Sequence, residues 1–389
     1  MAQLVAQLPA GGLGNRDTTP GKAGGAVSGP RGALLQNELL EVHVDPHTGA
    51  IRGVFDHKSR GPRLAQQLAL RLPGASGDAD DAYSIMAADD LAVTSPGPVL
   101  GEVVVRGRLH DRQGRRVAGF RQTIRIWRGS RIIELDIELE PDEPLGSDPW
   151  NSYYASRLAW ADDSASFYRS VNQAVLSTDA MQMEAPHLID IRGEKVRTTL
   201  LCGGLPYHRR YGTRKLDTLL LVRGETCRRF RLGLGIDLPQ PMAAATAFLA
   251  PRTVAAGWAR PANAAGWLFH LDARGVLATH WEPLLEGGGR KAEDGEQGAM
   301  GGGQWEGESP RTASGGSSKP DETRIAGFRV RLVETDGRSI AVGLRTFRAV
   351  QSAKKVGRPS EPPTDLPVEG DRIALSLGPH EWAEIEARW

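Results

Sequence analysis

The chain has 389 residues, enough to bury a sizeable core and to form two or three domains. Its 48 basic and 47 acidic residues give a net charge of +1, which argues against electrostatic capture of nucleic acid or of an anionic membrane. No apolar run approaches the roughly 18–20 residues of a membrane span. The N-terminus lacks the pattern of a signal peptide, and two cysteines make no disulfide framework. We therefore expect a soluble, cytoplasmic protein without nucleic-acid or membrane partners.

The first regular element follows a loose N-terminal lead, which we place at residues 1–33. Residues 34–59, LLQNELLEVHVDPHTGAIRGVFDHKS, predict a strand, a tight turn and a second strand. The turn is expected between Asp45 and Gly49, because proline fixes φ there, aspartate caps the turn and glycine permits a positive φ.

Strand periodicity dominates the chain up to residue 237. Apolar and acidic residues alternate through residues 131–140, RIIELDIELE, as they do in a half-buried antiparallel strand. The only helical turn we expect lies near residues 62–70. Long strands joined by Gly, Pro and Asp turns favour a β-sandwich over an α/β barrel. We assign residues 34–240 to this domain.

A second β domain is predicted at residues 241–389, after the proline-containing break at 238–241. It is interrupted by residues 286–323, which are rich in Gly, Ser and charge and contain almost nothing apolar. Such a segment cannot bury enough surface to offset its chain entropy, so we expect a disordered insertion.

Aromatic residues gather in residues 148–160, DPWNSYYASRLAW. Aromatic faces stack on the apolar faces of pyranose rings, which makes Trp150 and Tyr153 candidates for sugar binding. Tyr154 and Trp160 are expected in the sandwich core, and a core position is the alternative for the other two as well.

Basic residues precede a strand in residues 206–222, PYHRRYGTRKLDTLLLV. The guanidinium groups of Arg209 and Arg210 can orient sugar hydroxyls through forked hydrogen bonds. The alternative is a solvated basic loop. Neither an HxH nor an HExxH spacing occurs in the chain, so the sequence gives no sign of a self-contained metal site.

Five segments, in order, resemble the C-terminal β region of glycoside hydrolase family 38, the α-mannosidases. The opening strand–turn–strand resembles the family's Asn-Glu, Asp-Pro-x-Thr-Gly and Asp-x-Lys-Ser-Gly pattern. The other segments are LAQQLALRLPGASGDADDAYSIM, GFRQTIRIWRGSRIIELDIELEP, LCGGLPYHRRYGTRKLD, and the end of the chain from GFRVRLVETDG to PHEWAEIEARW. The resemblance covers residues 34–285 and 324–389.

The resemblance implies an all-β fold, with a galactose-mutarotase-like β-supersandwich followed by a smaller terminal β-sandwich domain. It implies a part in α-mannoside hydrolysis, with the zinc and the nucleophile in a catalytic barrel whose motifs have no match in this sequence. We therefore expect no cofactor and no turnover in this chain alone. The expected partners are an α-mannoside and either a separate catalytic-barrel chain or a second copy of this chain.

By motif position, the resemblance places Tyr83 and either Arg209 or Arg210 at the sugar. A surface that packs on a barrel is expected to be exposed when the barrel is missing. Trp150, Tyr153 and Tyr83 would then cluster on one exposed face, with the two arginines at its rim and residues 1–33 nearby.

Two other functions fit the same pattern. One is a stand-alone carbohydrate-binding module without turnover. The other is a sugar epimerase or lyase, because supersandwich folds also occur in those enzymes; His43, His208 and Tyr83 would then be the acid/base candidates.

Overall fold

The fold is taken from a computed structural model, which describes residues 25–29, 32–56, 61–72, 80–250, 267–286, 325–357 and 362–389. Within these ranges the protein is almost entirely antiparallel β-sheet, as predicted. Its contacts divide it into two units. The larger one holds the described residues up to Ala250 together with Thr335–Gly337, and the smaller one holds the other described residues from Trp267 to Trp389. No helix in the described part of the chain is long and apolar enough to cross a membrane.

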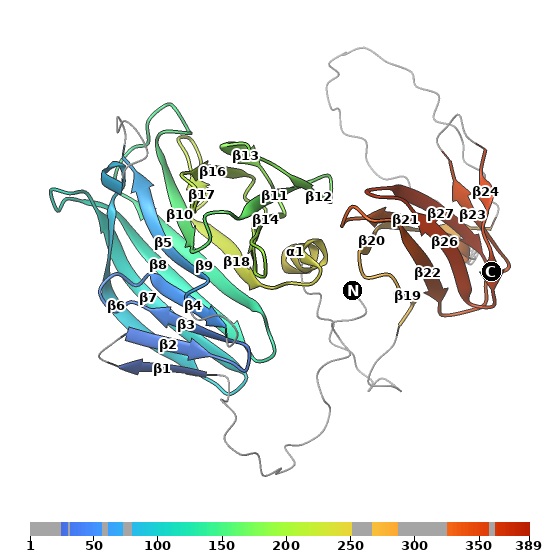
Figure 1. Cartoon of the computed structure of the whole chain (residues 1–389), viewed down its shortest axis with the longest axis horizontal. Helices are drawn as coiled ribbons and strands as arrows, with labels where there is room; N and C mark the ends of the chain where they lie inside the picture. The colour runs from blue at the N-terminus through green and yellow to red at the C-terminus, as the bar shows by residue number, and fades with distance from the viewer. Residues whose placement is uncertain are drawn as a thin grey trace, which may run out of the picture. The chain divides into compact units, whose positions relative to one another are not determined.

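The larger unit is a β-supersandwich of two nine-stranded sheets within the described residues (Figure 1). The first, sheet A, has the strand order β1 (Gly25–Gly29), β2 (Gly32–Gln36), β3 (Leu40–Val44), β4 (Ile51–Asp56), β5 (Leu64–Arg71), β10 (Tyr153–Trp160), β17 (Lys215–Leu221), β16 (Tyr207–Tyr211) and β13 (Gln182–Glu184).

The second sheet, sheet B, faces sheet A across the core. Its order is β12 (Ala174–Ser177), β11 (Ser166–Val171), β14 (Leu188–Arg192), β15 (Arg197–Leu201), β18 (Arg229–Ile236), β9 (Ile132–Pro141), β8 (Arg116–Trp127), β7 (Leu100–His110) and β6 (Ile85–Pro96). A short 3₁₀ helix, η1 (Asp80–Ala82), precedes β6.

Alternation along the strands builds the core between the two sheets. In β9, Ile133, Leu135 and Ile137 are fully buried in this core, whereas Glu134 and Glu138 point to the other face. The predicted core residues Tyr154 and Trp160 also lie in it. Side chains on the opposite face of each sheet are therefore free for other uses.

The smaller unit is a β-sandwich of two sheets with its own core. In the described residues, sheet C has the order β19 (Phe269–Leu271), β22 (Ile340–Thr346), β26 (Arg372–Leu377) and β25 (Val368–Glu369). Sheet D has the order β20 (Val276–Leu285), β21 (Ile325–Glu334), β27 (Trp382–Arg388), β23 (Ser352–Val356) and β24 (Thr364–Asp365). Phe328, Val330, Leu344 and Ile385 are among the buried residues between the sheets.

Two local expectations are corrected by the structure. The helical turn expected near residues 62–70 is wrong, because β5 is a strand that pairs with β10. A helix was missed at α1 (Pro241–Leu249), where Pro241 occupies the first turn and Met242, Ala245 and Phe248 are buried. This helix belongs to the larger unit.

Two segments that we expected to lack regular structure lie only partly within the described residues. Residues 25–29 and 32–33, placed in the loose lead of residues 1–33, instead form β1 and the start of β2. Residues 1–24 lie outside the described residues. So does the predicted disordered insertion at 286–323, apart from Glu286.

Candidate functional site

The outer face of sheet A, on the side away from the core, carries the candidate site. On β10, Tyr154 and Leu158 point into the core, so the alternating residues Tyr153 and Arg157 point outward. Strand pairing places Tyr153 beside Arg71 of β5. On the other flank, Arg157 pairs with Asp217 of β17. Three neighbouring strands therefore bring large polar side chains to one place.

A hydrogen-bonded network surrounds the carboxylate of Asp217, which is fully buried. The hydroxyls of Tyr83 and Tyr153 each donate to its Oδ2 at 2.7 Å, and Nε of Arg157 donates to Oδ1 at 3.1 Å. Nη1 of Arg71 donates to the Tyr83 hydroxyl at 3.2 Å. The charge of the carboxylate is thus matched by a guanidinium and satisfied by two phenols.

Stacked aromatic rings also pack against this network. The rings of Tyr83 and Tyr211 lie 5.8 Å apart with an interplanar angle of 6°. Cζ of Arg157 lies 3.5 Å from the centre of the Tyr83 ring. Arg157 is therefore held by an ion pair and a cation–π contact at once, which fixes its position.

Burial shifts the acidity of both phenols. Burial and, second to it, the adjacent Asp217 carboxylate raise the pKa of Tyr83 to about 12. The pKa of Tyr153 is also raised, first by burial and then by the charge of Asp217. Both hydroxyls are therefore neutral hydrogen-bond donors at physiological pH.

A loop carrying Trp150 borders this network at the surface. Trp150 packs against the buried cluster that contains Tyr153. Nη1 of Arg209 donates to the Trp150 carbonyl at 2.6 Å and to Oδ1 of Asn151 at 3.1 Å. The ring of Trp150 meets that of Tyr207 edge-on at 6.0 Å, and Tyr207 is 42% exposed. The loop and β16 therefore present two aromatic rings and a guanidinium group together.

Side chains of β16 point alternately to the outer face of sheet A and to the core. Arg209 pairs with Asp217 across the ladder and lies on the outer face, whereas Arg210 pairs with the core residue Leu216. Cζ of Arg210 lies 4.1 Å from the ring centre of Phe167, a core residue of β11. Arg210 therefore does not join Arg209 at the candidate site.

The predicted site residues divide into three groups. Trp150 and Arg209 lie together at the surface of the outer face. Tyr153 lies in the buried cluster against which Trp150 packs, and Tyr83 is joined to it through Asp217. The two tyrosines are only 0% and 1% exposed, so the expected exposed patch of Trp150, Tyr153 and Tyr83 is wrong. Arg210 is on the inner face.

Sequence reasoning did not select Asp217, Arg71 or Tyr207. Asp217 had a usable signal, because it is an acidic residue at the start of the buried run Leu216–Leu221. A charge in such a strand needs a buried partner.

The three acid/base candidates of an epimerase or lyase are not assembled in the structure. His208 is fully buried on the core side of sheet A, where burial lowers its pKa to about 4. Its Nε2 donates to the Ala185 carbonyl at 3.2 Å, and its Nδ1 accepts from the Thr218 hydroxyl at 3.1 Å. Tyr83 is on the other face, and His43 lies on β3, packed against Phe55.

The described residues contain no group of three His, Cys, Asp or Glu side chains placed to hold a metal ion. The zinc that the family resemblance implies therefore finds no donor set in this part of the chain.

Comparisons with known proteins place the fold. No protein-family model matches the chain, and no curated protein matches it by sequence. A glycosyl hydrolase family 38 protein from Enterococcus faecalis superposes with a TM-score of 0.60 and 9% identity, covering 91% of this chain and 43% of its own. An α-mannosidase from Enterococcus faecalis V583 gives a TM-score of 0.57, 10% identity and coverages of 91% and 42%.

The chain thus has the fold of a β region of family 38 proteins and spans less than half of their length, as the sequence resemblance predicts. A galactose mutarotase-related enzyme from Lactobacillus acidophilus matches more weakly, with a TM-score of 0.33 over 53% of this chain at 8% identity.

Proposed function

We propose that this chain forms the β region of an α-mannosidase-like glycoside hydrolase and that the outer face of sheet A supplies one wall of its sugar site. In the intact assembly the reaction is hydrolysis of α-mannosides. The catalytic groups come from another domain or chain, and Trp150, Tyr207 and Arg209 bind and orient the sugar.

The observation that carries this proposal is the surface group of Trp150, Tyr207 and Arg209. The aromatic faces suit the apolar side of a pyranose ring, and the guanidinium suits its hydroxyls. Arg209 is already held by the Trp150 carbonyl at 2.6 Å, so little side-chain freedom remains to be lost when a sugar binds.

The buried network has a supporting role in this proposal. Tyr83 and Tyr153 are too deeply buried to contact a sugar, but both bind Asp217, and Trp150 packs against the Tyr153 cluster. They are positioning residues that fix the strand ends beneath the Trp150 loop.

Binding of simple glycosides to the full chain tests the proposal. Saturation-transfer NMR is expected to detect methyl α-mannoside in preference to methyl α-glucoside, and Trp150→Ala or Arg209→Ala is expected to abolish the signal. Arg210→Ala is the matched control, because its side chain faces the core. Equal signals for both sugars, or signals unchanged by Trp150→Ala and Arg209→Ala, would count against the proposal.

Assays of the chain alone examine where the catalytic groups lie. We expect no hydrolysis of an aryl α-mannoside with or without added zinc. Steady, chelator-sensitive turnover would contradict the assignment of those groups to another domain or chain. Association with a catalytic-barrel chain, or self-association, is read from the molar mass in light scattering.

A further inference from the structure

A second group of aromatic side chains lies in the smaller unit, at the end strands β19 and β20 of its two sheets. We name the aromatic edge as Trp267, Phe269, Trp281, Phe347 and Trp389. The centre of the Phe269 ring lies 4.0 Å from that of Trp281 and 6.5 Å from that of Phe347. Phe347 in turn lies 5.4 Å from Trp389. Phe269, Trp281, Phe347 and Trp389 therefore form one connected group of rings. Trp267 lies two residues before Phe269 in the chain and contacts Arg345.

The outer rings of the aromatic edge are exposed although they rest on a packed base. Phe269 packs against the buried core residue Phe328 at 4.8 Å. Trp267, Trp281 and Phe347 are 47%, 38% and 45% exposed. Leaving so much aromatic surface in water forgoes hydrophobic stabilisation, which marks the edge as a candidate binding surface.

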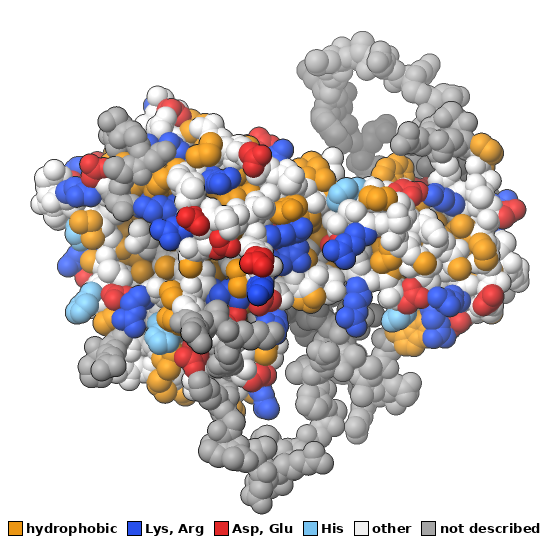
Figure 2. All heavy atoms as spheres, in the orientation of Figure 1, with side chains coloured by type: hydrophobic (Ala, Val, Ile, Leu, Met, Phe, Trp, Pro, Cys, Tyr) orange, Lys and Arg blue, Asp and Glu red, His pale blue; other side chains and the backbone are white. Residues whose placement is uncertain are grey.

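Polar groups stand beside the exposed rings. Cζ of Arg345 lies 5.8 Å from the ring centre of Trp267, and its Nε and Nη2 donate to Oδ2 of Asp371 at 3.2 and 2.7 Å. Cζ of Arg348 lies 5.0 Å from the ring centres of both Phe347 and Trp389. On the face shown in Figure 2, hydrophobic side chains of this unit lie among Lys, Arg, Asp and Glu side chains rather than in a continuous apolar sheet.

We propose that the aromatic edge is a carbohydrate-binding site for neutral pyranose oligosaccharides. The CH faces of a pyranose stack on Trp267 and Phe347, its hydroxyl oxygens accept hydrogen bonds from Arg345 and Arg348, and its hydroxyl protons reach Asp371. Alternation of rings with fixed charged groups matches the amphipathic surface of a sugar. A stable protein interface instead concentrates apolar side chains at its centre and excludes charges from it.

This site is distinct from the one on sheet A. It lies in the other unit, uses different strands and does not depend on the proposed function. It gives the chain a means of holding a polysaccharide that is separate from any site of turnover.

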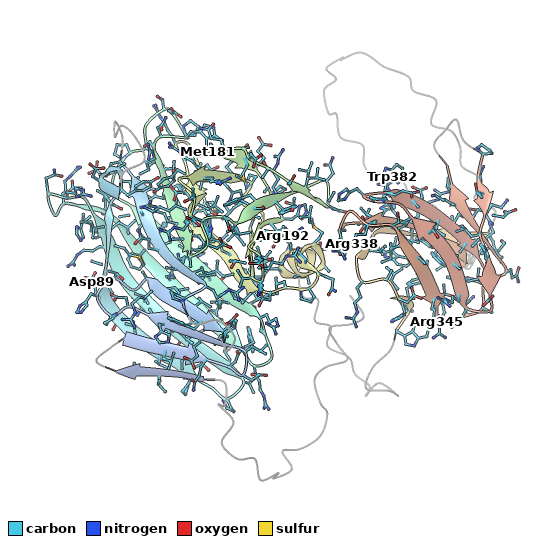
Figure 3. The ribbon with its side chains drawn as sticks, in the orientation of Figure 1. Asp89, Met181, Arg192, Arg338, Arg345 and Trp382 are labelled. Carbon is cyan, nitrogen blue, oxygen red and sulfur yellow. The ribbon has the colours of Figure 1, made fainter. Side chains whose placement is uncertain are left out.

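Trp382 offers a matched control within the same unit. It is 50% exposed and Cζ of Arg331 lies 5.1 Å from its ring centre, so it shares the exposure and the cation–π contact of the edge residues. It has no neighbouring ring among the described aromatic contacts, unlike Phe269, Trp281, Phe347 and Trp389. Figure 3 shows Trp382 and Arg345 at opposite margins of the smaller unit.

The test is isothermal titration of the full chain with α-linked mannotriose, cellotriose and xylotriose. Trp150→Ala is present in every protein so that the sheet A site does not contribute. We expect at least one trisaccharide to bind, and Trp267→Ala and Phe347→Ala each to weaken binding about threefold to tenfold. Trp382→Ala is expected to leave the affinity unchanged, and thermal melts confirm that each variant is folded.

Three outcomes would overturn the proposal. One is that none of the trisaccharides binds. The second is that Trp382→Ala weakens binding as much as Trp267→Ala does. The third is that Trp267→Ala and Phe347→Ala leave the affinity unchanged but alter the molar mass in light scattering, which would make the edge a protein-docking surface. Arg345→Lys checks the polar half of the site, because it keeps the charge but loses the forked geometry.

Discussion

The outer faces of the two sheets of the supersandwich use the same residue types in opposite ways. On sheet B, arginines and carboxylates alternate across β7, β8, β9 and β18 as a partly exposed ladder. Arg125 binds Glu102 and Asp136, Arg121 binds Glu138, and Arg231 binds Glu134. On sheet A, one carboxylate, Asp217, is fully buried and is shared by Arg157 and two tyrosines.

The difference teaches how burial changes the value of an ion pair. At an exposed pair of the ladder such as Arg121 and Glu138, water and salt screen the charges, so the pair is worth only about 0–1 kcal/mol. Around Asp217, removing a partner leaves an unpaired charge away from water, which lowers the free energy of unfolding far more. The ladder keeps the sheet B face solvated, whereas the Asp217 network gives the sheet A face a rigid, specific geometry.

The largest expected effect comes from removing the buried carboxylate of Asp217, compared with removing that of Glu138 on the ladder. Asp217→Ala is expected to lower the free energy of unfolding of the larger unit by about 3–5 kcal/mol, because Arg157 is left buried without its charge partner. Glu138→Ala on the ladder is expected to cost less than about 1 kcal/mol. Urea unfolding followed by tryptophan fluorescence measures both. Similar losses for the two variants would erase the contrast between the faces.

Removing one phenol hydroxyl is the next test. Tyr83→Phe loses a hydrogen bond to a buried carboxylate and is expected to destabilise the larger unit by about 1.5–3 kcal/mol. Tyr168→Phe is the control, since the contact of its ring with Arg192 survives the change; its effect is expected within about 0.5 kcal/mol. If both variants melt at the wild-type temperature, Tyr83 has no structural role in the network.

Alkaline pH is expected to weaken the buried network on sheet A through Tyr83. The pKa of Tyr83 is about 12 in the folded chain and ordinarily 10, so above pH 10 the unfolded chain loses this proton first. Stability from this group is complete below pH 10 and is lost as pH rises towards 12, by about 2 kcal/mol. Urea titrations between pH 9 and 11.5 measure this loss. A slope that Tyr83→Phe leaves unchanged would show that other groups cause it.

Salt is expected to have the smallest effect and to act on sheet B. A double-mutant cycle on Arg231 and Glu134 is expected to give a coupling of about 0.2–1 kcal/mol at low salt. The coupling should fall by more than half in 1 M NaCl, where the Debye length is about 3 Å. The cycle on Arg157 and Asp217 is expected to keep its coupling in both salts, and a parallel decline would contradict its shielding.

The sequence predicted the regular strands better than the short helix and the strand that contains good helix formers. The alternation in residues 131–140 corresponds to β9, because a period of two survives whatever the strand packs against. Residues 64–71 contain good helix formers, yet pairing with β10 makes them a strand, as sheet context commonly overrides propensity. Helix α1 was missed because Pro241 suggested a break, although proline is favoured in the first turn of a helix.

The candidate site was harder to predict because its contacts are distant along the chain. Tyr83 and its acceptor Asp217 are 134 residues apart. The motif resemblance selected Tyr83, but only the fold shows that it is buried and bound to Asp217. Likewise, the adjacent arginines of residues 209–210 looked equivalent until strand pairing placed them on opposite faces.

Those opposite faces of β16 also set how related chains should diverge. Core-facing positions such as His208 and Arg210 are constrained by the shape of a shared interior, so substitutions there require matching changes in Met183 or Phe167. Under the proposed function, the outward Arg209 is constrained instead by the bound sugar and by its contact with the Trp150 loop. Along this one strand, neighbouring codons are therefore expected to change under different selection: specificity can evolve at Tyr207 and Arg209, whereas His208 and Arg210 preserve the core and Tyr211 preserves the stacked network.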